Sequence, residues 1–143
     1  MNLHKGVIFC WTLVALAAGY LLFGPAPGSG DQEPAVKKTV DSYVRAFAAG
    51  NGDLACDQLT DAAHDAVVGM AKAIGAEDCP SAMEKTRQIG GDEVRSIAKK
   101  IRVRKIDVDG GRAKVTLRAS GQDSIAELER TEKGWKISSL PNT

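Results

Sequence analysis

Apolar side chains recur every three or four positions at the start of the polar part of the chain. Over residues 31–49 they form one stripe, and Gly50 follows the last of them. This periodicity predicts an amphipathic helix over residues 31–49. Weaker helical patterns predict shorter helices over residues 53–59, 62–74, 82–89 and 92–99. Because glycine interrupts helices, Gly90-Gly91 is expected to separate the last two.

From Ile101 onward the apolar period changes to two, which is typical of half-buried strands. Tight-turn signals predict three two-residue loops, at Gly110-Gly111, Gly121-Gln122 and Lys133-Gly134. The resulting four-stranded antiparallel meander places Val115 opposite Leu128, with Trp135 and Ile137 on the same face. Since side chains alternate along a strand, this register gives the sheet one continuous apolar face.

The first strand of this meander changes its apolar parity. Val103 is apolar at an odd position, whereas Ile106 and Val108 are apolar at even ones. A one-residue bulge near Arg104-Lys105 would restore a single face, and bulges bend sheets. The predicted fold is therefore α+β, with N-terminal helices packed into a curved, cone-shaped antiparallel meander.

The amino-terminal residues form a separate segment. Residues 7–23 contain no charged side chain, and residues 24–30 are rich in Gly and Pro. Counted from residue 6 to residue 26, the stretch reaches the roughly 20 residues that a helix needs to cross a bilayer. We expect a signal-anchor or transmembrane helix with a short linker over residues 1–30, and one extracytoplasmic domain over residues 31–143.

The charge pattern sets the expected orientation of this anchor. Lys5 is the only charged residue ahead of the apolar segment, so the positive-inside bias keeps the amino end in the cytoplasm. The protein is then a single-pass protein of the cell membrane with its domain outside. The alternative is a secretory signal that is cleaved, which would release a secreted domain.

Composition excludes several classes of protein. Hydrophobic residues make up 43% of the 143 residues and charged residues 26%, which excludes a disordered chain, a collagen-like repeat and a polytopic membrane protein. The formal net charge of +1 argues against nucleic acid as a partner. The basic run over residues 99–105 is expected to be a solvated strand face, and contact with anionic lipid or wall polymers is the alternative.

Cys56 and Cys79 are the two cysteines of the domain. An even number of cysteines outside the cytoplasm predicts a disulfide, with free buried thiols as the alternative. The bond would close a loop of about 24 residues and stabilise the fold by about 3 kcal/mol. His64 has no second histidine or cysteine pair near it, so no metal site is expected.

The arrangement resembles a known family. The residues that carry the resemblance are the helix AVKKTVDSYVRAFAAGN, the segment DLACDQLT and the closing hairpin ELERTEKGWKIS. Together they are similar to the nuclear transport factor 2-like cone fold, which includes ketosteroid isomerase and SnoaL-type polyketide cyclases. The chain looks most like membrane-anchored or secreted bacterial members of unassigned role. It departs from the largest members, which have up to six strands.

The resemblance implies a pocket between the sheet and the helices. The candidate lining residues are Tyr43, Phe47, Val115, Leu117, Leu128, Arg130 and Trp135. Most are apolar, so a packed core is the favoured interpretation. Arg130 points inward by parity, and it either meets a buried carboxylate or anion, or extends its head into water along Trp135. The second arrangement is the expected one.

The same residues favour a non-catalytic protein. An isomerase of this family needs an inward carboxylate, but Asp123, Glu127 and Glu129 fall on the polar face. We therefore expect a membrane-tethered binding or interaction module with no catalytic residue, metal or cofactor. Its partner would be a protein, a small apolar ligand, or a second copy bound through the face of Thr116 and Arg118. The alternative is a small isomerase- or cyclase-like enzyme that uses the hollow.

Overall fold

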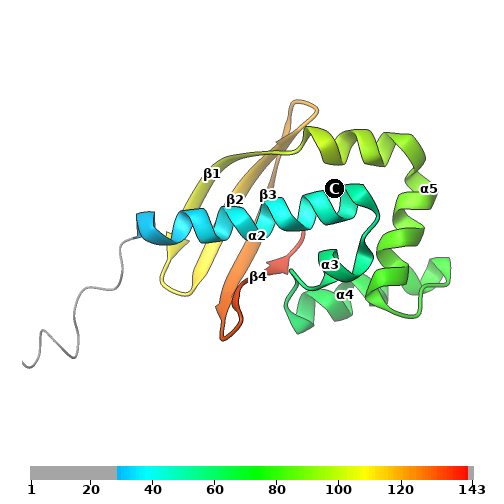
Figure 1. Ribbon diagram of the computed structural model, residues 1–143, viewed down its shortest axis with the longest axis horizontal. Helices are drawn as coiled ribbons and strands as arrows, with labels where there is room; N and C mark the ends of the chain where they lie inside the picture. Colours follow the sequence, from blue (N-terminus) through cyan, green and yellow to red (C-terminus); the bar gives the residue numbers. More distant parts are fainter. Residues whose placement is uncertain (1–28, 142–143) are drawn as a thin grey trace, which may run out of the picture.

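The computed structural model describes residues 29–141, and these form helices followed by one sheet (Figure 1). The helices are α2 (Ser29–Ala49), α3 (Gly52–Cys56), α4 (Asp61–Ala71), the short 3-10 helix η1 (Lys72–Ile74) and α5 (Cys79–Lys100). The strands are β1 (Arg102–Asp109), β2 (Arg112–Ala119), β3 (Gln122–Thr131) and β4 (Gly134–Ser139). The α+β class is therefore confirmed.

The expected membrane anchor lies in the part of the chain that precedes the described residues. Across residues 29–141, the structure contains no helix that combines the length and the apolarity needed to cross a membrane. The first described helix, α2, begins at Ser29, two residues before the predicted start of the domain.

The sheet is an antiparallel meander with the strand order β1-β2-β3-β4. Ile106 lies opposite Val115 and Val108 lies opposite Ala113, as the Gly-Gly turn predicted. The buried residues of the sheet all belong to one face, and they are Ala113, Val115, Leu117, Ala126, Leu128, Trp135 and Ile137. The single apolar face is therefore confirmed.

The turn between β2 and β3 lies one residue earlier than predicted. Its central residues are Ser120 and Gly121, and both have positive φ angles, of 51° and 82°. Such a turn matches the twist of the strands that it joins. Val115 consequently lies opposite Ala126 instead of Leu128. This two-residue change of register leaves every side chain on its predicted face, because the strand period is two.

The predicted irregularity in β1 is confirmed. The pairing with β2 shifts between Val103 and Lys105, which leaves Arg104 as the additional residue. A bulge of this kind lets Val103 and Ile106 face the same side despite their different parity. It also interrupts an edge strand, since β1 is the first strand of the sheet.

Helix α2 crosses the apolar face of the sheet (Figure 1). Val36 and Val40 are 0% and 2% exposed, so its predicted apolar stripe forms the centre of the core. Between them on the same side, the hydroxyl group of Thr39 donates a hydrogen bond of 3.0 Å to the backbone oxygen of Trp135. This bond joins α2 directly to β4.

The helices that follow α2 are held by caps and by a disulfide. Thr60 accepts a hydrogen bond from the backbone of Ala63 at the start of α4, and Asp78 forms a capping box with Ser81 at the start of α5. Cys56 and Cys79 form the predicted disulfide, with a Cα–Cα distance of 6.1 Å. The bond connects the end of α3 to the first residue of α5.

Candidate functional site

The predicted hollow between helices and sheet is filled by side chains. Val115 and Leu128 are 0% and 1% exposed and belong to one continuous hydrophobic cluster, together with Leu117 and Trp135. Phe47 is half-buried and packs against this cluster. The two grooves described below are lined by none of the seven predicted pocket residues.

Of the two helix residues predicted to line the hollow, Tyr43 and Phe47, only Tyr43 has a polar group. Its ring is stacked on that of Phe47, with 6.3 Å between the ring centroids. Its hydroxyl group donates to the sulfur atom of Met83 over 3.7 Å. Burial raises the pKa of Tyr43 to about 12, because the charged phenolate would lose its hydration. The hydroxyl group is therefore protonated at any physiological pH.

Arg130 differs from its neighbour Trp135 in exposure. It pairs with Trp135 across β3 and β4, near the end of the hairpin. Its side chain is exposed, which corresponds to the expected arrangement with the charged head in water.

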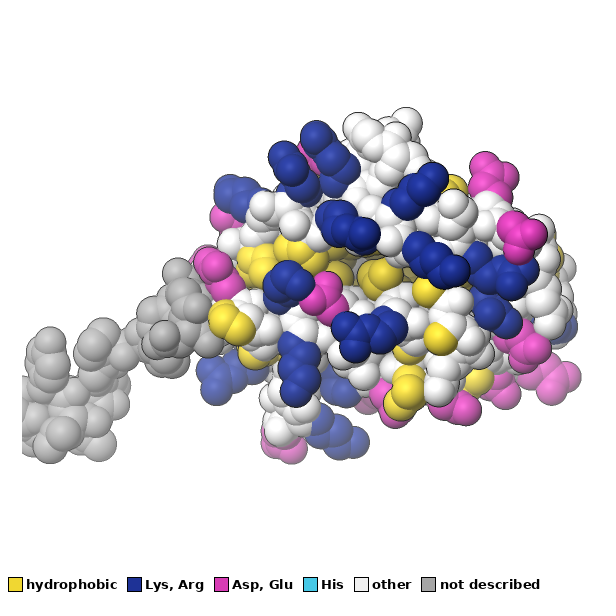
Figure 2. All heavy atoms as spheres, turned by 45° about the horizontal axis from the view of Figure 1, so that its top comes forward, with side chains coloured by type: hydrophobic (Ala, Val, Ile, Leu, Met, Phe, Trp, Pro, Cys, Tyr) yellow, Lys and Arg dark blue, Asp and Glu magenta, His cyan; other side chains and the backbone are white. Residues whose placement is uncertain are grey.

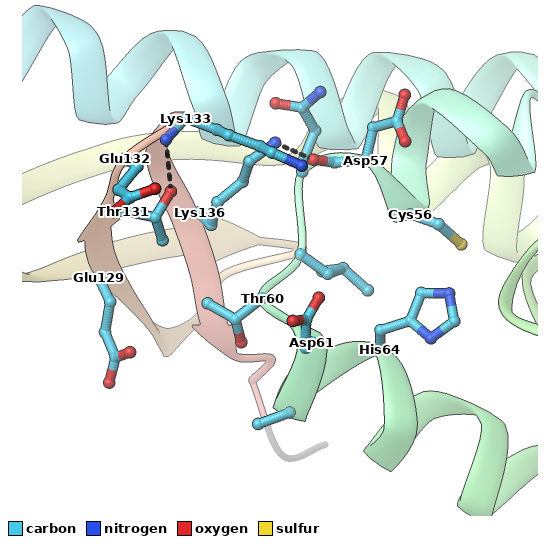
Figure 3. A pocket seen from close by; sticks show the side chains of 13 residues that line it. Cys56, Asp57, Thr60, Asp61, His64, Glu129, Thr131, Glu132, Lys133 and Lys136 are labelled. Carbon is cyan, nitrogen blue, oxygen red and sulfur yellow. Dashed lines mark hydrogen bonds between the residues drawn. The ribbon is translucent and has the colours of Figure 1, made fainter.

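An open groove lies between the segment that joins α3 to α4 and the β3–β4 hairpin (Figure 3). We call it the polar groove, and its volume is about 960 Å³. Its lining residues are Cys56, Asp57, Gln58, Leu59, Thr60, Asp61, Ala62, His64, Glu129, Thr131, Glu132, Lys133 and Lys136. Sequence reasoning did not identify this groove.

Backbone pairing along β4 builds the polar groove. The backbone N–H of Ile137 donates to the oxygen of Gln58 over 2.7 Å, and that of Thr60 donates to the oxygen of Ile137 over 2.9 Å. These bonds form a parallel bridge between Leu59 and Ile137. The joining segment thus covers the free edge of β4 and is held beside the disulfide at Cys56.

The ionisable side chains of the polar groove have mixed charge. Figure 3 shows Asp61 and His64 on the helical side and Glu132 and Lys133 on the hairpin. Lys136 reaches across and donates to the backbone oxygen of Asp57. Such a surface offers both carboxylates and ammonium groups to a partner.

His64 is not paired with a group that would make it a catalytic base. Its Nδ1 atom lies 3.9 Å from the carboxylate of Asp65, which is beyond hydrogen-bond distance. The structure shows no cluster of three metal-ligating residues within the described part of the chain.

The polar groove could not be found from local sequence patterns. Its two walls lie about 70 positions apart in the chain, at Asp57–Asp61 and at Glu129–Lys136. The only local signal was the cap at Thr60, which fixes where α4 begins.

A search of family models, of curated proteins and of solved structures finds no match to this chain.

Proposed function

We propose that this protein is a membrane-tethered, extracytoplasmic binding module that contacts a protein partner through its surface. The proposal rests on the contrast between a filled interior and an open surface groove. The apolar face of the sheet, where an isomerase of the resembled family would hold its reacting groups, is filled by Val115, Leu128 and Trp135 at 0, 1 and 7% exposure. The polar groove, by comparison, is open and presents ionisable side chains.

The chemistry of the polar groove suits a polar segment of a partner protein. Carboxylates at Asp61 and Glu132 and ammonium groups at Lys133 and Lys136 line one cavity. Because the groove has charges of both signs, it favours a partner surface with the complementary charge pattern. A partner surface with charges of one sign only would be repelled by part of the groove. The disulfide and the β4 pairing hold one wall in place, which limits the ordering cost of binding.

The compartment is proposed from two independent features. The uncharged stretch over residues 7–23 is suited to a membrane anchor, with Lys5 holding the amino end inside. The bonded pair Cys56–Cys79 is suited to an oxidising environment outside the cytoplasm.

The nuclear transport factor 2-like, cone-shaped form of the fold is also a proposal. It is supported by the element order, with a long first helix, short helices and a final meander. The bulge at Arg104, which would curve the sheet around α2, supports it further.

The isomerase- or cyclase-like alternative finds less support. It needs an acid or base of suitable pKa within the hollow. The displaced carboxyl pKa values belong to exposed groups and are lowered, at Asp78 by the backbone N–H of Ser81 and at Asp123 by a hydrogen bond from Arg118. Lowered carboxyl pKa values favour ion pairing and capping over proton transfer.

Membrane fractionation tests the tether and the compartment. The full chain, expressed in bacterial cells, should stay in the membrane pellet after alkaline carbonate extraction and should begin at or near Met1. Protease added outside spheroplasts should digest the domain. A mature chain that begins near Asp31 would replace the tether by secretion, and protection from protease would contradict the extracytoplasmic placement.

Truncation of Leu128 tests whether the hollow is filled. Leu128→Ala should lower the free energy of unfolding by about 3 kcal/mol, because it leaves a cavity in a packed core. Ile125→Ala, on the same strand but 56% exposed, should lower it by less than about 1 kcal/mol. Denaturant unfolding of both variants measures the difference. A loss at Leu128 as small as that at Ile125 would indicate an open pocket and restore the enzyme hypothesis.

A further inference from the structure

A second groove lies on the other side of the molecule, between α2, the end of α5 and the start of β1. Its volume is about 710 Å³. We call it the basic groove, and its lining residues are Lys37, Asp41, Val44, Arg45, Ala48, Ala49, Ala98, Lys99, Ile101, Arg102 and Val103. Figure 2 shows Lys and Arg side chains spread around a strip of apolar side chains on one face of the molecule.

Three of the four cations that line the basic groove have no carboxylate partner among the described residues. Lys37 is paired with Asp41, but among the described residues no carboxylate lies within ion-pair distance of Arg45, Lys99 or Arg102. Arg102 is held in place because its guanidinium group donates to the backbone oxygens of Lys99 and Ile101, both over 2.8 Å. Three unpaired cations around one cavity favour an anionic ligand.

The floor of the basic groove is apolar and only partly covered. Val44, Ile101 and Val103 are half-buried and pack against the edge of the hydrophobic core. An apolar strip bordered by cations fits the interfacial region of a bilayer, where headgroup charge and acyl chains adjoin. A free inorganic anion would use the cations alone.

Several cations on the outer side of the sheet are paired with carboxylates. On the outer side of the sheet, Arg118 forms a bidentate ion pair with Asp123, with distances of 2.7 and 3.0 Å. Lys114 lies 4.0 Å from Glu127 on the same side. These pairs compensate part of the positive charge on the outer side of the sheet, so an anionic surface is attracted less strongly to them than to the unpaired cations of the basic groove.

We propose that the basic groove binds the anionic headgroups of the membrane to which the domain is tethered. This inference rests on the proposed tether. Five residues separate Ser29 from the predicted end of the apolar segment at Phe23, so the domain would start within about 20 Å of the bilayer even if these residues were extended. A short tether raises the effective concentration of the surface, and weak electrostatic contacts then suffice.

Lysine footprinting of the full chain in lipid nanodiscs tests this docking. Lys37 and Lys99, which line the basic groove, and Lys100, which is next to Lys99 in the chain, should be acetylated at least about threefold more slowly in discs with 30% phosphatidylglycerol than in pure phosphatidylcholine. Lys114 and Lys133, outside the basic groove, should react at similar rates in both. Equal rates for all five lysines would overturn the proposal.

Charge-reversal variants give the matched control. Arg45→Glu with Lys99→Glu should abolish the protection of Lys37 and Lys100 in anionic discs. Lys114→Glu with Lys133→Glu changes the net charge equally and should leave that protection intact. If both pairs of substitutions reduce protection alike, the attraction depends on net charge and the groove is not the binding site.

Two further measurements complete the test. The first distinguishes lipid from other anionic ligands, and the second tests the tether by itself. Protection in neutral discs on adding inorganic phosphate or polyglutamate would overturn the lipid assignment in favour of a free anion or an acidic peptide. Co-purification of the chain with neutral discs measures the tether alone. If the chain is lost from neutral discs but retained by anionic ones, the tether is contradicted, whereas the binding of anionic headgroups by the basic groove is supported.

Discussion

Thr39 shows how a single buried polar group can connect two layers of the fold. It is 8% exposed, in a helix whose neighbouring inward positions are valines. Its hydroxyl group lies within hydrogen-bond distance of the backbone oxygens of Trp135 and of Ala35, at 3.0 and 3.3 Å. Buried polar groups are stable only when they are hydrogen-bonded, so Thr39 fixes the position of α2 along β4.

Removal of the Thr39 hydroxyl group should therefore destabilise the domain. Thr39→Val keeps the side-chain shape but deprives the oxygen of Trp135 of its donor, and it should lower the free energy of unfolding by about 1–2 kcal/mol. Urea unfolding measures the loss. Thr116→Val, on the outer face of the sheet, should change it by less than about 0.5 kcal/mol. Equal values for the two variants would show that the Thr39 bond is not stabilising.

Asp123 carries a pH dependence of defined sign. The hydrogen bond from Arg118 holds the pKa of its carboxyl group below the ordinary value of 3.8. A native pKa below the unfolded one means that the stabilisation is present above about pH 4 and is lost as the pH falls through the native pKa. In Arg118→Gln, NMR titration should find the pKa of Asp123 close to its ordinary value. An unchanged pKa would show that the ion pair does not form in solution.

At the scale of elements, α5 is two helices joined at a glycine pair. Gly91 has φ 54° and ψ −141°, a conformation essentially restricted to glycine. The axis changes direction there, which carries the second part of α5 over the end of α2 (Figure 1). Ala98 in that part is 3% exposed, so the turn brings α5 back onto the core.

Two glycine substitutions should have opposite effects. Gly91→Ala forces a side chain into a strained backbone conformation and should lower stability by about 1–3 kcal/mol. Gly69 lies inside α4, with nothing within 4 Å of an added Cβ, so Gly69→Ala should raise stability by up to about 1 kcal/mol. Thermal unfolding should give melting temperatures shifted in opposite directions. A stabilising Gly91→Ala would show that α5 is continuous in solution.

At the scale of the whole molecule, the disulfide joins two helices, α3 and α5. Cys79 is fully buried and bonds to Cys56 across a sequence separation of 23. The same region holds the polar groove in place, because Cys56 lies at one end of its lining. The disulfide therefore contributes both to stability and, together with the pairing along β4, to the shape of the proposed binding surface.

Loss of the disulfide should destabilise the domain. Cys56→Ala with Cys79→Ala should lower the free energy of unfolding by about 3 kcal/mol, the chain-entropy value for a loop of this length. Non-reducing peptide mapping of the unaltered protein should find the Cys56–Cys79 peptide. Two freely alkylated thiols would show that the bond does not form.

Prediction from sequence succeeded where the signal was local and periodic. The stripe of α2, the apolar face of the meander and the bulge near Arg104 all follow from spacing along the chain. The register between β2 and β3 was predicted wrongly. Ser120-Gly121 and Gly121-Gln122 are both acceptable turns, and the apolar pattern is the same for either one.

The sequence by itself determined which apolar side chains of α2 and of the sheet face inward, since periodicity and turn chemistry act over a few residues. The tertiary structure alone decided which distant segments meet. The polar groove joins positions about 70 residues apart, and the basic groove joins α2 to a segment about 50 residues after its end. Such encounters depend on how whole elements pack, and no local pattern encodes where two exposed polar surfaces will leave a gap.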